Sequence, residues 1–306
     1  MTLSRGPAED ARALSPPAND HHVISPTQVS YIDPESGADK PPSTPKRHAH
    51  HPNRRNGPSR PRSPPTLSRS PAITQLSILS RRDFPLPPGA GSEKARVIVH
   101  KDFLAYDDPV LVESLKGAEG CVWAQGVSAN DVSKEEYVNI TVGYPVAAAK
   151  AFAPLSDKFK FVYVSSEGAD PTEKSYTYFA RIKGRAETHL LSLPSSSPSL
   201  SSLRMYNVRP FFIDPGPGNW HRNESFLFTS VAAPILRVVL PTGLHTPTDE
   251  LARTLVDLAI GDGRPVTVRD GKGVEAQGRT LRSSVIRRWG EVWGTAADGE
   301  TIHTEF

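Results

Sequence analysis

A chain of 306 residues with 37% hydrophobic residues and a formal net charge of +3 suits one good-sized domain with a long tail. Its single cysteine, Cys121, excludes a disulfide framework and favours a reducing compartment. No apolar run is long enough to span a bilayer, and no apolar signal-peptide core opens the chain. We therefore expect a cytoplasmic protein, with a mitochondrial location still open.

The N-terminal part differs sharply from the rest in composition. Thirteen of the thirty prolines lie in residues 1–65, and residues 40–82 carry ten basic and no acidic side chains. With little hydrophobic periodicity, residues 1–70 are predicted to be a disordered Pro/Ser/Arg/His-rich tail. Within it, RPRSPP (60–65) could bind an SH3-like domain as a polyproline II helix. The basic run is only a weak nucleic-acid or membrane signal, and a solvated tail without a dedicated partner is the simpler interpretation.

From residue 71 onward, short apolar strands alternate with amphipathic helices. This alternation predicts an α/β domain with a parallel sheet, and continuously apolar strands fit a sheet that is covered on both faces. Ser133 and Glu136 form a capping box at the start of a long helix, and the Ser/Pro-rich segment 194–202 is predicted to be a surface loop. The predicted strands are 73–80, 95–100, 120–126, 161–164 and 205–210, and the predicted helices are 109–116, 133–152, 175–191 and 249–260.

The strongest functional signal is the stretch 161–187, FVYVSSEGADPTEKSYTYFARIKGRAE. A buried strand ends at Ser165 and Ser166, and the amphipathic helix that follows carries Lys183. With the other segments, this stretch resembles the short-chain dehydrogenase superfamily. The resemblance is closest to its atypical, nucleotide-sugar-epimerase-like branch of NAD(P)-binding proteins, which includes the Tat-interacting-protein oxidoreductases. It covers residues 71–290 and implies a Rossmann-like, doubly wound parallel sheet.

The resemblance also implies a reaction. The family transfers a hydride between NADP and a small carbonyl compound or a sugar nucleotide. Ser165 or Ser166 would hold the substrate carbonyl. Lys183 would bind the nicotinamide ribose and lower the pKa of a catalytic Tyr. The position of that Tyr, four residues before Lys183, is Phe179, which has no proton to donate. The adjacent Tyr178 is rotated by about 100° on the helix and could substitute only if the helix is irregular.

The cofactor-binding residues are likewise implied by the resemblance. Arg81 and Arg82 would face the adenosine 2′-phosphate, which favours NADP over NAD, because the forked guanidinium matches phosphate geometry. Asp102 would accept a hydrogen bond from the adenine amine. The remaining cofactor positions are Phe103 beside the adenine ring, Ala124, Gln125 and Gly126 under a ribose, and Pro210 after the strand at 205–210.

The chain departs from the family at its beginning. The family opens with a strand and a Gly-x-x-Gly-x-x-Gly turn that cradles the pyrophosphate, but the only glycines before residue 89 are Gly6, Gly37 and Gly57. The first strand and most of its helix are therefore predicted to be missing, leaving an N-terminally incomplete Rossmann domain at 71–306 with unpaired strand edges. A truncated or misread gene product would explain this.

Several interpretations stay open. Ser165 and Ser166 fit a simple turn, Lys183 a solvated helix position and Asp102 a loop cap, and no spacing of histidines supports a metal site or a catalytic triad. The sequence therefore allows an NADP-linked oxidoreductase, a catalytically silent Rossmann-fold protein with a binding or regulatory role, or an interaction protein that is recruited through its tail.

Overall fold

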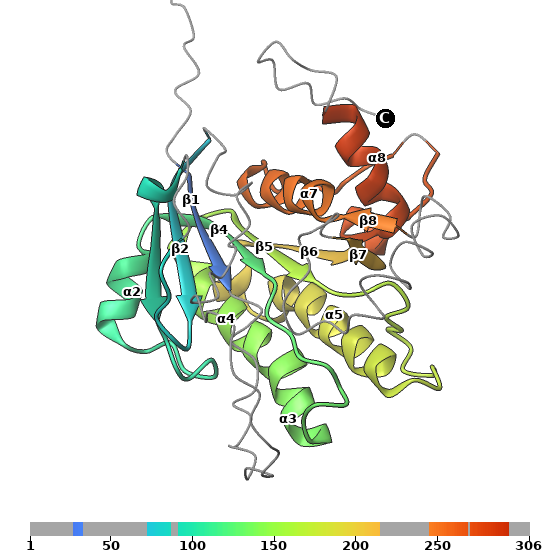
Figure 1. Cartoon of the computed structure of the whole chain (residues 1–306), viewed down its shortest axis with the longest axis horizontal. Coiled ribbons are helices and arrows are strands. Elements are labelled where there is room, and N and C mark those ends of the chain that lie inside the picture. The colour runs from blue at the N-terminus through green and yellow to red at the C-terminus, as the bar shows by residue number, and fades with distance from the viewer. Residues whose placement is uncertain (1–26, 33–71, 87–90, 215–244, 269, 294–306) are drawn as a thin grey trace, which may run out of the picture.

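A computed structural model describes residues 27–32, 72–86, 91–214, 245–268 and 270–293 (Figure 1). Their main feature is an eight-stranded sheet in the order β3-β2-β1-β4-β5-β6-β10-β9, in which only the edge strand β9 runs antiparallel. The strands are β1 Thr27–Ile32, β2 Ile73–Ser80, β3 Ala95–Val99, β4 Ala118–Trp123, β5 Phe159–Val164, β6 Leu203–Arg209, β9 Val274–Glu275 and β10 Thr280–Arg282.

Helices cover both faces of this sheet (Figure 1). One core cluster packs α2 (Pro109–Leu115), α4 (Tyr144–Phe152) and α5 (Tyr178–Ser196) on one face, and the second packs α7 (Thr248–Ile260) and α8 (Ser283–Trp293) on the other. A second, two-stranded parallel sheet pairs β7 (Phe212–Asp214) with β8 (His245–Pro247). The predicted α/β, Rossmann-like class is confirmed. Within the described ranges, no helix has the length and apolarity needed to cross a membrane.

The prediction that the first strand is missing is wrong. Strand β1 lies between β2 and β4 and pairs in parallel with both, so it occupies the centre of the sheet. Its sequence, TQVSYI, has the β-branched and aromatic residues that favour strands, but its proline-rich surroundings concealed it. The expected unpaired edges of β2 and β4 are therefore filled. The Gly-rich turn and helix that the family has after this strand would fall in residues 33–71, outside the described residues.

The predicted helix 133–152 is present with an irregular centre. Ser133 caps α3 (Lys134–Val138) by accepting a hydrogen bond from the Glu136 amide at 3.1 Å, as the capping box predicted. A π-helical turn, η3 (Asn139–Gly143), then leads into α4. Proline at 145 has no N–H to donate to the Thr141 carbonyl. That carbonyl instead accepts a hydrogen bond from the hydroxyl of Tyr163 at 3.2 Å, which connects η3 to β5.

Helix α5 is longer than predicted, because it continues through Pro194 to Ser196 into the segment predicted as a surface loop. The hydroxyls of Ser192, Ser195 and Ser196 each bond a carbonyl three residues earlier. These bonds satisfy the carbonyls of His189, Ser192 and Leu193 in the last turns of the helix. The remainder of the predicted loop forms a short 3₁₀ turn at Pro198–Leu200.

A buried carboxyl group makes the contact between α7 and α8 sensitive to pH. Asp257 accepts a hydrogen bond from Trp289 Nε1 at 3.2 Å, and burial raises its pKa from 3.8 to about 6. As the pH rises from about 4 to 6, the unfolded chain loses this proton and the folded chain keeps it, so stability falls by up to about 3 kcal/mol and then levels off.

We therefore predict that Asp257→Asn raises the free energy of unfolding by about 2 to 3 kcal/mol at pH 8 and leaves it unchanged at pH 4. Urea unfolding at both pH values measures this. Asp157→Asn, at an exposed position, is the matched control and should change stability by less than about 0.5 kcal/mol. An equal gain at both pH values would contradict the titration of Asp257.

Candidate functional site

The strand order predicts a ligand-binding crevice at the carboxyl edge of the sheet. Strands β1, β2 and β3 lie next to one another in chain order, toward one edge of the sheet. Strand β4 then pairs with the other side of β1, so the direction of the strand order reverses there. In parallel α/β sheets, ligands bind outside the carboxyl ends of the strands at this switch point. The sequence-predicted site residues follow β2, β3, β4, β5 and β6, so all of them except those on α5 lie at this edge by topology.

Lys183 reaches this edge from α5. Its Nζ lies 3.3 Å from the Val164 carbonyl at the end of β5 and 5.0 Å from the centroid of the Tyr163 ring. Burial lowers the pKa of this amine to about 8, although the nearby Glu187 carboxylate acts to raise it. The alternative interpretation of Lys183 as a freely solvated helix residue does not fit these contacts. The amine is held at the end of β5 and titrates close to neutral pH.

Two serines, Ser165 and Ser166, come directly after the end of β5. The Ser165 backbone N–H donates to the Val208 carbonyl at 2.8 Å, which fixes the turn to the end of β6. In the described part of the chain, the side-chain oxygens of Ser165 and Ser166 are buried without any hydrogen-bond partner. A buried polar group without a partner is costly, and such groups mark places where a ligand or water completes the bonding. The structure brings Lys183, Ser165 and Ser166 together.

The hydroxyls of Tyr178 and Tyr163 are both engaged in hydrogen bonds to backbone carbonyls. The Tyr178 hydroxyl donates to the Lys134 carbonyl at 3.1 Å, and its ring packs against Tyr137 on α3. Phe179, at the expected Tyr position, is 41% exposed. The phenol beside Lys183 is that of Tyr163, which is 1% exposed and bonded to the Thr141 carbonyl of η3. The alternative role of Tyr178 as proton donor stays a prediction, and its hydroxyl is engaged elsewhere.

The ends of β2 and β3 carry the residues predicted for the adenosine. Arg81 has two guanidinium nitrogens, Nε and Nη2, that are buried and make no hydrogen bond with any described residue. Arg82 is exposed. Asp102 caps its own loop by accepting from the Leu104 amide at 2.9 Å. Phe103 is only 1% exposed and packs on Trp123 and Tyr144, so the structure places it in the core.

The remaining predicted site residues lie at the carboxyl edge of the sheet, in the segment after β4 and directly after β6. A Cβ built on Gly126 would meet no atom within 4 Å, so there is open space above this turn. Gln125 is buried, and Ala124 is partly exposed. Pro210 is buried, and its carbonyl accepts the Glu167 amide at 2.8 Å, next to the two serines. These positions line the β4–β6 part of the crevice edge.

A buried ion-pair network behind Lys183 was not predicted. The Arg209 guanidinium donates two hydrogen bonds to the Glu187 carboxylate, from Nε at 2.8 Å and from Nη2 at 2.5 Å. Its Nη1 donates a third, to the Glu275 carboxylate at 2.8 Å. Glu187 and Arg209 are both almost fully buried. The sequence spacing alone places Glu187 one helical turn after Lys183. The contact of Glu187 with Arg209 depends on the folded structure and has no signal in the sequence.

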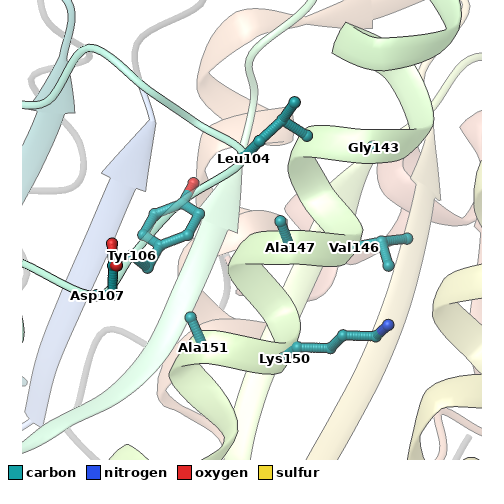
Figure 2. A pocket seen from close by; sticks show the side chains of 8 residues that line it. All are labelled: Leu104, Tyr106, Asp107, Gly143, Val146, Ala147, Lys150 and Ala151. Carbon is teal, nitrogen blue, oxygen red and sulfur yellow. The ribbon is translucent and has the colours of Figure 1, made fainter.

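A shallow groove lies outside the crevice, between the loop after β3 and α4 (Figure 2). It has a volume of about 530 Å³. None of the residues predicted for the site lines it, so it supports no role in the predicted chemistry. Its lining residues are Leu104, Tyr106, Asp107, Gly143, Val146, Ala147, Lys150 and Ala151.

Comparison with known proteins identifies the family. No family model matches the chain. Leucinostatins biosynthesis cluster protein T of Purpureocillium lilacinum is 35% identical over 240 residues, which cover 71% of this chain and 86% of that protein. The chain belongs to the family of leucinostatins biosynthesis cluster protein T.

Solved structures define the fold of this cluster protein T family member. The terminal R domain of the myxalamid PKS-NRPS pathway superposes with a TM-score of 0.51 at 11% identity, covering 83% of this chain and 64% of that one. A nucleoside-diphosphate-sugar epimerase of Agrobacterium tumefaciens has a TM-score of 0.48 at 13% identity, with coverage of 87% and 85%. With the strand order, the first of these supports the Rossmann-like, doubly wound α/β fold that the sequence predicts.

Proposed function

We propose that this protein binds NADP(H) in the crevice at the carboxyl edge of the sheet and that its hydride chemistry is slow or silent because the phenolic acid is absent. The observation that carries the proposal is the placement of Lys183. A half-buried amine, bonded to the Val164 carbonyl beside two unpaired serine hydroxyls, is an arrangement suited to a polar ligand at the end of β5.

The residues present fit a nicotinamide dinucleotide at both ends. Lys183 and the serines Ser165 and Ser166 offer donors for a ribose and a carboxamide or carbonyl. At the other end, the unpaired guanidinium nitrogens of Arg81 suit a 2′-phosphate, which favours NADP over NAD. Gly126 leaves open space between the two ends. The pyrophosphate-binding turn would lie in residues outside the described ranges.

The chain's own residues limit what the bound dinucleotide can do. The dinucleotide supplies or accepts the hydride. Reduction of a carbonyl also needs a proton donor, and a positioned acid typically contributes 10²- to 10⁴-fold. Phe179 offers none, which favours a protein that binds the dinucleotide without appreciable turnover, in a regulatory or sensing role.

A second candidate function is a slow NADP-linked oxidoreductase that uses Lys183 as its acid. Burial lowers the pKa of this amine to about 8, so it is mostly charged at pH 7 and still acidic enough to donate. Its activity would fall as the pH rises through about 8. The relative is named as a protein of a biosynthesis cluster. By analogy, we propose that the substrate is a small carbonyl compound of a biosynthetic route.

Titration of the full chain with NADPH and NADH, followed by nicotinamide fluorescence, tests the binding proposal. We expect NADPH to bind more tightly than NADH, and Arg81→Ala to weaken NADPH binding by about 10- to 100-fold through lost charge-assisted hydrogen bonds. Lys183→Ala should weaken both dinucleotides by about tenfold. Lys158→Ala, at an exposed position before β5, is the control and should change neither. Saturation by neither dinucleotide would refute the proposal.

A further inference from the structure

We propose that His100 joins Arg81 in binding the 2′-phosphate of the adenosine, so that the preference for NADP(H) over NAD(H) rises as the pH falls. This inference rests on the proposed function and adds a residue that determines its specificity. His100 is the first residue after β3, and its role does not follow from the sequence pattern.

The sheet holds the two side chains on neighbouring strand ends. Ser80 pairs with Val99, and the His100 amide donates to the Ser80 carbonyl at 2.8 Å. Adjacent strands are about 4.8 Å apart, and each side chain shares a face with those two positions away. Leu79 and Ile98 pack in the same core cluster, so Arg81 and His100 continue the same face beyond the strand ends.

Four unpaired polar atoms belong to the two loops that follow β2 and β3. His100 Nε2 and the Tyr106 hydroxyl are buried, as are Arg81 Nε and Nη2, and none of these atoms bonds to any residue in the described ranges. The His100 and Tyr106 rings lie 4.9 Å apart between centroids. Buried polar groups almost always have partners. Four such atoms on adjoining loops therefore indicate a site that an acceptor-rich group completes, and a phosphate provides three acceptor oxygens.

The surroundings of His100 make its charge respond to such a ligand. Burial lowers its pKa below 6.5, and the backbone of Asp102, the Asp102 carboxylate, the backbone of Ala105 and the Asp108 carboxylate, which raise it in that order, only partly compensate. The rings of Phe103 and Tyr106 cover it from its own loop, and the cation of Arg81 begins the loop after β2. The imidazole is therefore mostly neutral at pH 7 without ligand, and a phosphate dianion beside it would favour the charged form.

Proton uptake on binding sets the sign of the pH effect. If His100 becomes charged when the 2′-phosphate binds, NADPH affinity must increase as the pH falls. Between pH 8.5 and 6.5 we expect about a fivefold tighter Kd for NADPH, because a nearby dianion typically moves a histidine pKa upward by one to two pH units. NADH lacks the 2′-phosphate and should show only the pH dependence that Lys183, whose pKa is about 8, gives to both dinucleotides.

Isothermal titration of the full chain with NADPH and NADH at pH 6.5 and 8.5 tests the inference. His100→Gln keeps a hydrogen-bond donor but does not titrate, so we expect its NADPH affinity to vary with pH no more than its NADH affinity does and to be about fivefold weaker than wild type at pH 6.5. His189→Gln, at an exposed position on α5, is the matched control and should retain the wild-type pH dependence. Inorganic phosphate as competitor distinguishes a free-anion site from an adenosine-phosphate site.

The outcomes separate this inference from the proposed function. If neither dinucleotide binds, the proposed function fails and the inference fails with it. If NADPH binds in preference to NADH but His100→Gln keeps the wild-type pH dependence, only the role of His100 is overturned. If phosphate at 10 mM blocks NADPH and NADH equally, the pocket is not a 2′-phosphate site. A pH dependence that His100→Gln removes, for NADPH alone, supports the inference.

Discussion

The variant Phe179→Tyr is expected to raise NADPH-dependent reduction of an activated diketone, such as 9,10-phenanthrenequinone, by at least about 100-fold. Position 179 lies one helical turn before Lys183, so a phenol there shares a helix face with an amine whose pKa is about 8. A cation at that distance lowers the pKa of a phenol, and a positioned acid contributes 10²- to 10⁴-fold. Steady-state oxidation of NADPH measures the gain.

Two further variants make the result specific. Tyr178→Phe should leave the rate of the Phe179→Tyr protein unchanged, because the Tyr178 hydroxyl is bonded to the Lys134 carbonyl. Adding Lys183→Met to Phe179→Tyr should abolish the gain. If Phe179→Tyr binds NADPH as the wild type does and gains no activity, the crevice does not have the catalytic geometry that the fold implies.

Glu187→Ala is expected to lower the free energy of unfolding by about 3 to 5 kcal/mol, because it leaves the buried Arg209 guanidinium without its principal partner. The second partner, Glu275, is 44% exposed and bonds only one guanidinium nitrogen. Since the Glu187 carboxylate also raises the pKa of Lys183, its loss should lower that pKa further. Urea unfolding at pH 7 measures the first effect.

The control uses an ion pair between Arg185, on the same helix, and Glu173, in the loop before that helix. Arg185 and Glu173 form a bidentate pair of similar geometry, but their side chains are 38% and 36% exposed. Glu173→Ala should therefore cost no more than about 1 kcal/mol. The double variant Glu187→Met with Arg209→Met should recover most of the stability, because well-packed apolar side chains can replace a buried pair. Equal losses for Glu187→Ala and Glu173→Ala would contradict this account.

The fold was predictable where local sequence determines the element. Strand β2 and helix α2 have continuous apolar or amphipathic patterns, and the Ser133 cap forms as the capping box indicates. Strand β1 was missed because six residues in proline-rich surroundings give little local signal. Its assignment depends on pairing with β2 and β4, whose residues are more than forty positions away in the chain. Propensity does not carry such long-range information.

The site was predictable only in part, for the same reason. A serine at a strand end and a lysine one helix later give a local pattern, and the structure brings Ser165 and Lys183 to one edge. Contacts between distant segments have no such pattern. Tyr178 bonds a carbonyl 44 residues earlier, and Arg209 lies 22 residues after the carboxylate that it grips. The core position of Phe103 likewise follows from packing.

The most direct test of the central claim is a crystal structure of the full chain grown with saturating NADPH. The account predicts one dinucleotide across the carboxyl ends of β2, β1, β4 and β5, with its 2′-phosphate bonded by Arg81 and its nicotinamide ribose bonded by Lys183. A well-ordered structure without dinucleotide density in this crevice, or with NADPH bound at another surface, would contradict it.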